Sequence, residues 1–136
     1  MATYPFAVED RERPASVHAE ITILGGMLVD TVAVVDATML LRDDDFSLDS
    51  HRRIYGAMLR LSEVGHAVDI VTVSEELKRK RELDSVGGVA YLASLSEGLP
   101  RKLSIENYVS IVRDKSLMRQ LMSVCDGGMI EAADIS

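Results

Sequence analysis

The chain has no tryptophan, a single cysteine and few aromatic residues, with two phenylalanines and four tyrosines among 136 residues. One cysteine, Cys125, excludes an internal disulfide and fits the reducing environment of the cytoplasm. The chain also lacks an apolar run of the roughly 20 residues that cross a bilayer, and its N-terminus lacks the basic start and apolar stretch of a signal peptide. We therefore expect a cytoplasmic domain without membrane contacts.

Positive charge is scarce as well, because 15 lysines and arginines stand against 22 aspartates and glutamates, for a formal net charge of -7. Binding to a nucleic-acid backbone is driven mostly by cationic contacts and counterion release. An acidic chain poor in aromatic residues is therefore a weak candidate for nucleic-acid binding, although a local basic patch would permit it. The basic run at residues 78–81 is interpreted first as a solvated helix end. The alternative is a small helical nucleic-acid-binding module.

The chain is rich in apolar residues, and their spacing is helical. Hydrophobic residues make up 47% of the sequence, which is enough for a packed core and too much for a disordered chain. A first helix is predicted after the N-cap residue Ser16. Its apolar stripe is Val17, Ile21, Leu24 and Leu28. The pair at residues 25–26, Gly-Gly, predicts a close neighbour against this helix.

Four further helices are predicted before residue 100. Thr31 is expected to cap a short helix, Ser47 to cap a helix over 48–64 that stops at Gly65, and Thr72 to open a third with Glu75 in a capping box. A fourth short helix is expected between the Gly-Gly pair at 87–88 and Gly98. The residues expected to face inward are Val32, Val35, Met39, Ile54, Met58, Leu61, Val73, Leu77, Val89, Tyr91, Leu92 and Leu95. No strand alternation is evident, so the fold class is all-α.

The last predicted helix, from Ser104 to about residue 126, is apolar around much of its circumference. Its three stripes are Ile105, Val109 and Val112; Ile111, Met118, Met122 and Cys125; and Leu117, Leu121 and Val124. A surface helix has one apolar stripe, whereas a helix with several is buried on several sides. In a chain of this size we expect a partner to cover part of it, the alternative being coverage by the rest of the chain alone.

The sequence carries no motif for catalysis, cofactor binding or metal binding. None of its nine glycines precedes a lysine, as a phosphate-binding Walker loop requires. His18, His51 and His66 lack the paired spacing of zinc ligands and are expected to be solvated or to make local contacts, as His51 would at a helix start. The acidic run at 43–45 is expected to form a solvated turn. We interpret the chain as a non-catalytic interaction module and keep a small hydrolase or metal enzyme as a third reading.

A series of short motifs runs in a fixed order from residue 14 to about residue 126. It begins with Pro-Ala-Ser-Val-His-Ala-Glu at 14–20, Leu-Gly-Gly-Met-Leu at 24–28 and Asp30. It continues through Asp-Phe at 45–46, His51, Ile54, Met-Leu at 58–59, Gly65, Val-Asp at 68–69, Val-Thr-Val at 71–73, Glu-Leu at 76–77 and Leu83. It ends with Val-Gly-Gly-Val-Ala-Tyr-Leu at 86–92, Tyr108 and Ile-Val-Arg at 111–113. The ordered set resembles the N-terminal domain of bacterial replicative DNA helicases of the DnaB family.

The resemblance implies an organisation for the chain. It places a mobile N-terminal arm at 1–13 and a compact helical head at 14–103. The first arm of a helical hairpin would then occupy 104–136, with the start of its turn or of a second arm. In the family, six such domains form a collar above an ATP-driven motor ring that unwinds duplex DNA. The motor domain is absent from these 136 residues, so we interpret the chain as a fragment of a longer helicase.

The resemblance also implies partners and contact residues. The expected partners are further copies of the chain, associating as dimers, and primase, with a helicase loader as a further candidate. DNA would be contacted mainly by the motor domain, which would also bind the ATP and magnesium. Ile111, Met118, Met122 and Cys125 are the expected oligomer interface, and Tyr91 and Met122 the positions expected to face primase. No catalytic, cofactor-binding or metal-binding residue is expected in this fragment.

Four positions depart from the family pattern. His18 stands where the family commonly has glutamate, Arg81 where it has glycine, and Ser104 where it has asparagine. The Gly-Gly pair at 127–128 disfavours helix, whereas the family pattern continues the hairpin arm through this point. We expect the helix to continue with a soft point there.

Overall fold

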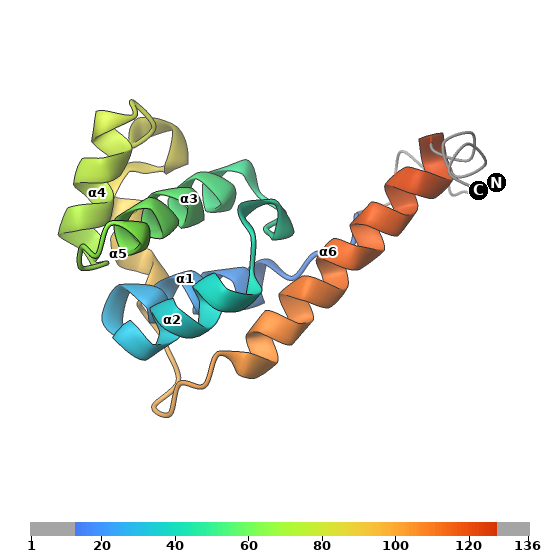
Figure 1. Cartoon of the computed structure of the whole chain (residues 1–136), viewed down its shortest axis with the longest axis horizontal. Coiled ribbons are helices and arrows are strands. Elements are labelled where there is room, and N and C mark those ends of the chain that lie inside the picture. The colour runs from blue at the N-terminus through green and yellow to red at the C-terminus, as the bar shows by residue number, and fades with distance from the viewer. Residues whose placement is uncertain (1–12, 128–136) are drawn as a thin grey trace.

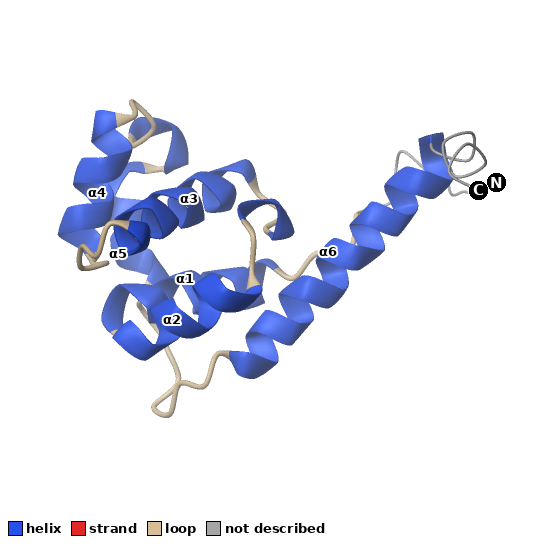
Figure 2. Ribbon diagram, in the orientation of Figure 1, coloured by secondary structure: helices blue, strands red, loops and turns tan. Residues whose placement is uncertain are grey.

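The structure, a computed structural model, describes residues 13–127, and this part of the chain is helical without any strand (Figures 1 and 2). The predicted mobile arm at 1–13 therefore lies outside the described residues except for Arg13, as does any continuation of the hairpin past Gly127. The elements in chain order are α1 (Val17–Val29), α2 (Thr31–Leu40), the 3-10 turn η2 (Asp43–Asp45), α3 (Asp49–Glu63), α4 (Ile70–Arg79), the 3-10 turn η3 (Asp84–Val86), α5 (Gly88–Leu95) and α6 (Glu106–Gly127).

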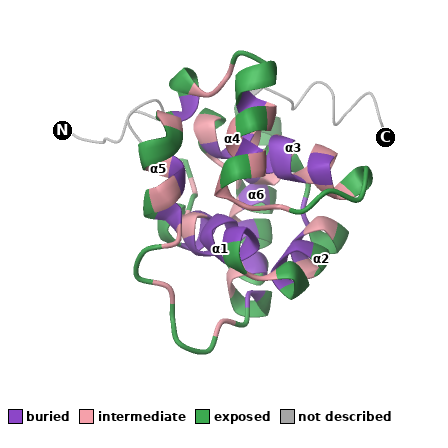
Figure 3. Ribbon diagram, turned by 90° about the vertical axis from the view of Figure 1, so that its left-hand side faces the viewer, coloured by how far each residue is buried: buried purple, intermediate pink, exposed green. Residues whose placement is uncertain are grey.

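Helix α1 lies at the centre of the head, in contact with α2, α3, α5 and α6. Helices α3 and α4 pack together beside it, and α6 runs along α1 and then extends away from the head (Figure 1). The buried faces of α1 and α3 turn towards this centre (Figure 3). The Gly-Gly pair of α1 permits the close approach that the sequence predicted, because a side chain at Gly25 would collide with the Leu95 carbonyl and one at Gly26 with Leu103.

Helix α1 begins as predicted, but the next three helix starts differ from the prediction. The Ser16 hydroxyl accepts a hydrogen bond from the Ala19 amide and caps α1. Helix α2 is capped by Asp30 rather than Thr31, and α4 begins at Ile70 with a capping box made by Asp69 and Thr72 rather than by Thr72 and Glu75. In both cases an aspartate one residue before the helix supplies a better cap than the threonine inside it.

Ser47 does not cap α3, which begins at Asp49. The Ser47 backbone amide donates instead to a carboxylate oxygen of Glu20 at 2.9 Å, and this bond ties the segment before α3 to α1. Arg52 holds the same segment from the other side by donating to the carbonyls of Phe46 and Ser47. The start of α3 is therefore set by long-range contacts that local capping preferences do not contain.

The inward face of α2 is also not the predicted one. Val32, Val35 and Met39 are exposed, and the face against α1 consists of Ala33, Val34 and Ala37. Apolar residues occupy both sides of this helix, so hydrophobicity alone does not select a face. The face with Ala33 and Ala37 lies against α1 because small side chains let the two helices approach closely.

The remaining predicted core positions are largely confirmed. Ile54, Met58, Leu61, Val73, Leu77, Leu92, Leu95, Ile105, Val109 and Val112 are buried, Tyr91 is half-buried and Val89 is exposed. The turn after α3 contains Gly65, whose φ of +78° suits glycine, and the turn after α4 contains Arg81, whose φ is +60°. In each turn an amide bonds back across five residues, from His66 to Leu61 and from Glu82 to Leu77.

Candidate interaction surfaces

Helix α6 meets the head through a single face. Ile105, just before the helix, and Val109, Val112 and Ser116 within it are buried against the head. Ser116 donates a hydrogen bond to an Asp45 carboxylate oxygen at 2.8 Å, and Arg119 donates to the Asp45 carbonyl at 2.7 Å. The stripe predicted from Ile105, Val109 and Val112 is thus the attachment of α6 to the head.

The other two apolar stripes of α6 are left open by the described residues. In the predicted oligomer interface, Ile111 and Met118 are 39% and 46% exposed, Met122 is half-buried, and the free Cys125 is exposed. The third stripe, Leu117, Leu121 and Val124, is about as open. The head covers one stripe only, so the alternative in which the rest of the chain covers the whole helix is not what residues 13–127 show. An apolar surface of this extent is typical of a site that contacts another protein.

Tyr91, one of the two predicted primase-facing residues, belongs to a buried polar network that joins three helices. Glu20 of α1 and His51 of α3 are buried, and a Glu20 carboxylate oxygen lies 2.7 Å from His51 Nδ1. On the other side of the ring, His51 Nε2 lies 2.6 Å from the hydroxyl of Tyr91 on α5. The local contact expected of His51 is confirmed, whereas His18 and His66 are exposed.

The network holds Glu20 in its ionised form. Burial opposes the charge, but hydrogen bonds from the His51 ring and from Ser47 outweigh it and keep the pKa of Glu20 below its ordinary value. Burial, followed by the nearby Glu20 charge, raises the pKa of the Tyr91 hydroxyl. The hydroxyl end of Tyr91 therefore serves the fold, and only the rest of its half-buried side chain is available to a partner.

The structure does not bring Tyr91 and Met122 together within one chain. Helix α5, which carries Tyr91, lies at one end of the molecule, and the last turns of α6, where Met122 lies, project at the other (Figure 1). A partner that contacts both positions must either span the molecule or bridge two copies of it.

The basic run at 78–81 lies at the exposed end of α4, as the sequence predicted for a solvated helix end. Arg79 is engaged there: it donates to Glu76 at 2.8 Å, and Arg60 donates to the same carboxylate at 2.6 Å. The hydrogen bonds from Arg79 and Arg60 lower the pKa of Glu76 to about 2. An arginine already bound to a carboxylate is a poorer ligand for phosphate, so Arg79 adds little to the alternative of a nucleic-acid-binding module.

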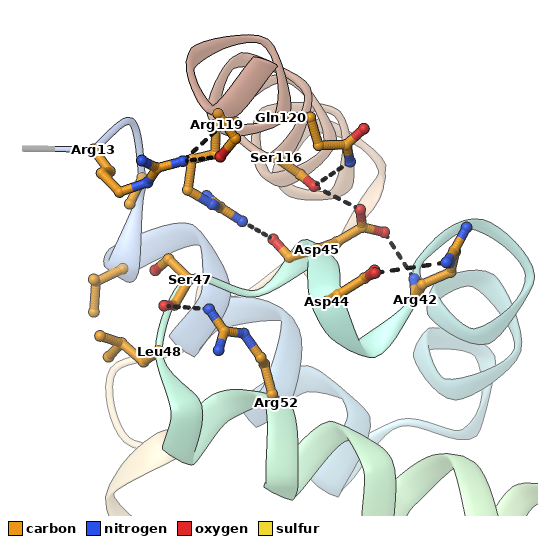
Figure 4. A pocket seen from close by; sticks show the side chains of 13 residues that line it. Arg13, Arg42, Asp44, Asp45, Ser47, Leu48, Arg52, Ser116, Arg119 and Gln120 are labelled. Carbon is orange, nitrogen blue, oxygen red and sulfur yellow. Dashed lines mark hydrogen bonds and ion pairs between the residues drawn. The ribbon is translucent and has the colours of Figure 1, made fainter. Parts of the chain in front are cut away.

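A cleft of about 870 Å³ lies between the head and α6 (Figure 4). Arg13 and Arg119 reach it from the start of the described chain and from α6, and Arg52 from α3. Arg13 donates to the Arg119 carbonyl and to the Ser123 hydroxyl. Sequence analysis missed this cleft, because its arginines are far apart in the chain and follow no spacing.

The described residues show no site for a metal ion and no membrane-spanning helix. No three histidine, cysteine or acidic side chains gather as ligands within residues 13–127. The acidic run at 43–45 forms η2, where Asp45 is bonded to Ser116 and to the Arg42 amide. No described helix is both long and apolar enough to cross a bilayer.

A helical head that carries a long helix, with two apolar faces that residues 13–127 leave uncovered, defines the class of this protein as an all-α domain with a projecting helix. The model of the DnaB-like helicase N terminal domain matches residues 12–114, and the chain belongs to that family. The crystal structure of the N-terminal domain of DnaB helicase from Mycobacterium tuberculosis superposes with a TM-score of 0.81 at 36% identity, covering 85% of this chain and 82% of that one.

The relatives known by sequence are much longer than this chain. The replicative DNA helicase DnaB of Geobacillus stearothermophilus is 39% identical over 113 residues, which are 83% of this chain and 25% of that protein. The replicative DNA helicase DnaC of Bacillus subtilis is 39% identical over 115 residues, 85% of this chain and 25% of that protein. The chain thus spans about a quarter of these relatives.

One further structural neighbour shares the fold at lower identity. The N-terminal domain of DnaB helicase from Helicobacter pylori, described with its interactions with primase, has a TM-score of 0.71 at 17% identity, covering 85% of this chain and 90% of that one. At this identity the likeness concerns the fold alone.

Proposed function

We propose that the chain is a collar domain of a hexameric replicative DNA helicase and that it joins subunits and docks primase. The observation that carries this proposal is the pair of uncovered apolar stripes on α6, in a chain of the DnaB N-terminal family. Exposure of an apolar stripe to water is energetically unfavourable. A second copy of the same helix presents a matching apolar stripe and can therefore bury it.

The two stripes support a division of contacts along α6. Ile111, Met118, Met122 and Cys125 form one face, on which we place the contact between copies. Leu117, Leu121 and Val124 form the adjacent face, which a second arm of the hairpin would cover. Primase would reach Met122 and the half-buried side of Tyr91, and their separation in one chain favours docking across two subunits.

The activity of the parent protein is part of the same proposal. ATP-dependent unwinding of duplex DNA, with its ATP and magnesium, is assigned to a motor domain outside these 136 residues. No glycine here precedes a lysine, so the chain does not fit an ATP phosphate group and we place no nucleotide site on it. A cytoplasmic location, DNA contact through the motor and binding of a helicase loader follow from this assignment.

Met122→Asp tests the association surface. A charge in the proposed interface has to be desolvated when copies pair, so we expect the variant to lose self-association while keeping its helix content. Size-exclusion chromatography with light scattering measures the former and circular dichroism the latter. Asn107→Asp is the matched control, because it adds one negative charge to an exposed position of α6 outside both stripes and outside the cleft.

Mixing each variant with the primase C-terminal domain of the same organism tests docking separately. We expect the parent chain and Asn107→Asp to form a complex and Met122→Asp to form less of it. An unfolded Met122→Asp would instead assign Met122 to the internal core. A wild-type chain that stays monomeric and ignores primase would overturn the proposal for this chain.

A further inference from the structure

The cleft between the head and α6 concentrates positive charge in an acidic protein. Four arginines line it, against two aspartates, whereas the whole chain has a formal net charge of -7. The aspartates lie at one end: Asp44 is paired with Arg42 at 3.5 Å, and Asp45 is bonded to Ser116. The remaining three, Arg13, Arg52 and Arg119, lie towards the other end (Figure 4).

These three guanidinium groups are held by neutral oxygens. Arg119 donates to the carbonyls of Pro14 and Asp45, and Arg52 to those of Phe46 and Ser47. Within residues 13–127 none of the three is within ion-pair distance of a carboxylate. Carbonyl oxygens fix the direction of a guanidinium group but do not neutralise its charge as an ion pair does.

The three charges also repel one another. Burial lowers the pKa of Arg119; among its charged neighbours, Glu20 raises that pKa more than Arg52 lowers it, and Asp45 and Arg13 act less strongly in opposite directions. Each arginine still has N–H groups that make none of the hydrogen bonds described above, since a guanidinium carries five. Three oriented arginines that form no ion pair within residues 13–127 are complementary to a carboxylate or a phosphate.

The rest of the lining decides between these two anions. Val17 and Leu48 border the cleft beside the arginines, and both are 39% exposed. Aliphatic walls suit a peptide that carries apolar and acidic side chains, whereas a nucleic-acid strand would present its phosphates to charge alone.

We infer that this cleft is a docking site for an acidic and aliphatic segment of a partner protein. Carboxylates of the segment bind Arg13, Arg52 and Arg119, and its aliphatic side chains pack on Val17 and Leu48. The site is separate from the apolar stripes of α6, because the cleft-facing Ser116, Arg119 and Ser123 lie on the attached side of the helix. The inference does not rest on the assignment of primase as a partner.

The test uses the whole chain and a labelled peptide in which glutamate and leucine recur at helical spacing. Fluorescence anisotropy is measured against a matched peptide with glutamine in place of glutamate, and against a labelled single-stranded oligonucleotide. We expect the acidic peptide to bind best and its affinity to fall with salt. Arg13→Glu should weaken binding by about tenfold, because it replaces an attraction with a repulsion.

Two further variants keep the result interpretable. Leu48→Asn removes one aliphatic contact, for which we expect a loss of about threefold. Arg101→Glu makes the same charge change as Arg13→Glu at an exposed loop position outside the cleft. Because it alters only the net charge, it should change the affinity for the acidic peptide by no more than about twofold relative to the parent chain. Thermal melting of each variant checks that the head is folded.

Several outcomes would overturn the inference. Equal binding of the acidic and glutamine peptides, equal effects of the two arginine variants, or no binding of the acidic peptide would each do so. Preference for the oligonucleotide would make the arginines a nucleic-acid contact instead. If Arg13→Glu abolished self-association while peptide binding was absent, the occupant of the cleft would be a second copy of this chain.

Discussion

At the scale of single residues, Arg81 is the clearest departure from what its backbone position favours. Arg81 lies in the turn after α4 at a φ of +60°. In this conformation a residue with a side chain is strained, whereas glycine is not. Arg81→Gly should therefore raise the free energy of unfolding by about 1 kcal/mol. Urea denaturation measures this, and Gly65→Ala at the equivalent turn after α3 should lower stability by a similar amount. If Arg81→Gly were neutral or destabilising, the Arg81 side chain would make a contact whose energy offsets the backbone strain.

Glu76 gives the chain a predictable response to acid. Its pKa is held at about 2, against an ordinary value of 4.5, by hydrogen bonds from Arg79 and Arg60. A lowered folded-state pKa contributes stability above the unfolded value, and that contribution is lost as the pH falls from 4.5 towards 2. Melting temperatures of Glu76→Gln should fall less steeply than those of the parent chain over this range. Glu75→Gln, an exposed neighbour on the same helix, should follow the parent more closely.

At the scale of secondary-structure elements, the contact between α1 and α5 depends on Gly25. A Cβ atom there would collide with the backbone carbonyl of Leu95, which cannot move without shifting α5. Gly25→Ala should lower the free energy of unfolding by about 3 kcal/mol. Gly56→Ala is the control, because its Cβ would meet only the end of the Arg60 side chain, and it should stabilise α3 by about 1 kcal/mol. Similar melting temperatures for the two variants would contradict the packing argument.

Sequence periodicity predicted the elements with one dominant apolar face better than those with two. Ile54, Met58 and Leu61 of α3 are buried as predicted, because the opposite side of that helix is polar. Helix α2 has apolar residues all round, so periodicity does not determine which face is buried. The face that packs against α1 is the one with the small residues Ala33 and Ala37.

The buried network and the cleft were beyond sequence reasoning for a different reason. Glu20, His51 and Tyr91 each belong to the motifs that carried the family resemblance, yet their mutual contact depends on three helices meeting. The cleft arginines come from positions 13, 52 and 119, which only the folded chain brings close. Polar contacts between distant positions leave no periodic signal, whereas apolar stripes do.

At the scale of the whole molecule, α6 has two functions that a pair of substitutions separates. Val112 is buried against the head, and Met122 lies on the open part of the same helix. Val112→Ala should lower the free energy of unfolding by about 2 kcal/mol, because it leaves a cavity between α6 and the head. It should leave the apolar stripes, and hence the oligomeric state under native conditions, unchanged.

Denaturation followed by circular dichroism and by fluorescence of an attached label measures the free energy of unfolding of Val112→Ala. Light scattering measures its oligomeric state. The opposite pattern is expected for Met122→Asp. If Val112→Ala dissociated the oligomer without loss of stability, the attachment of α6 and the association of copies would not be separable.

The single cysteine makes the far end of α6 a built-in spectroscopic position. Cys125 is the one thiol in the sequence and it is exposed, so a small spin label attaches at one place per chain. Because Cys125 lies on the proposed contact face, light scattering must first show that the labelled chain keeps the oligomeric state of the unlabelled one. Two labels in an assembled pair would lie side by side if the arms run parallel. They would separate by up to about 33 Å, the length of a helix of this size, if the arms run in opposite directions. One distance measurement would therefore fix the polarity of the pairing.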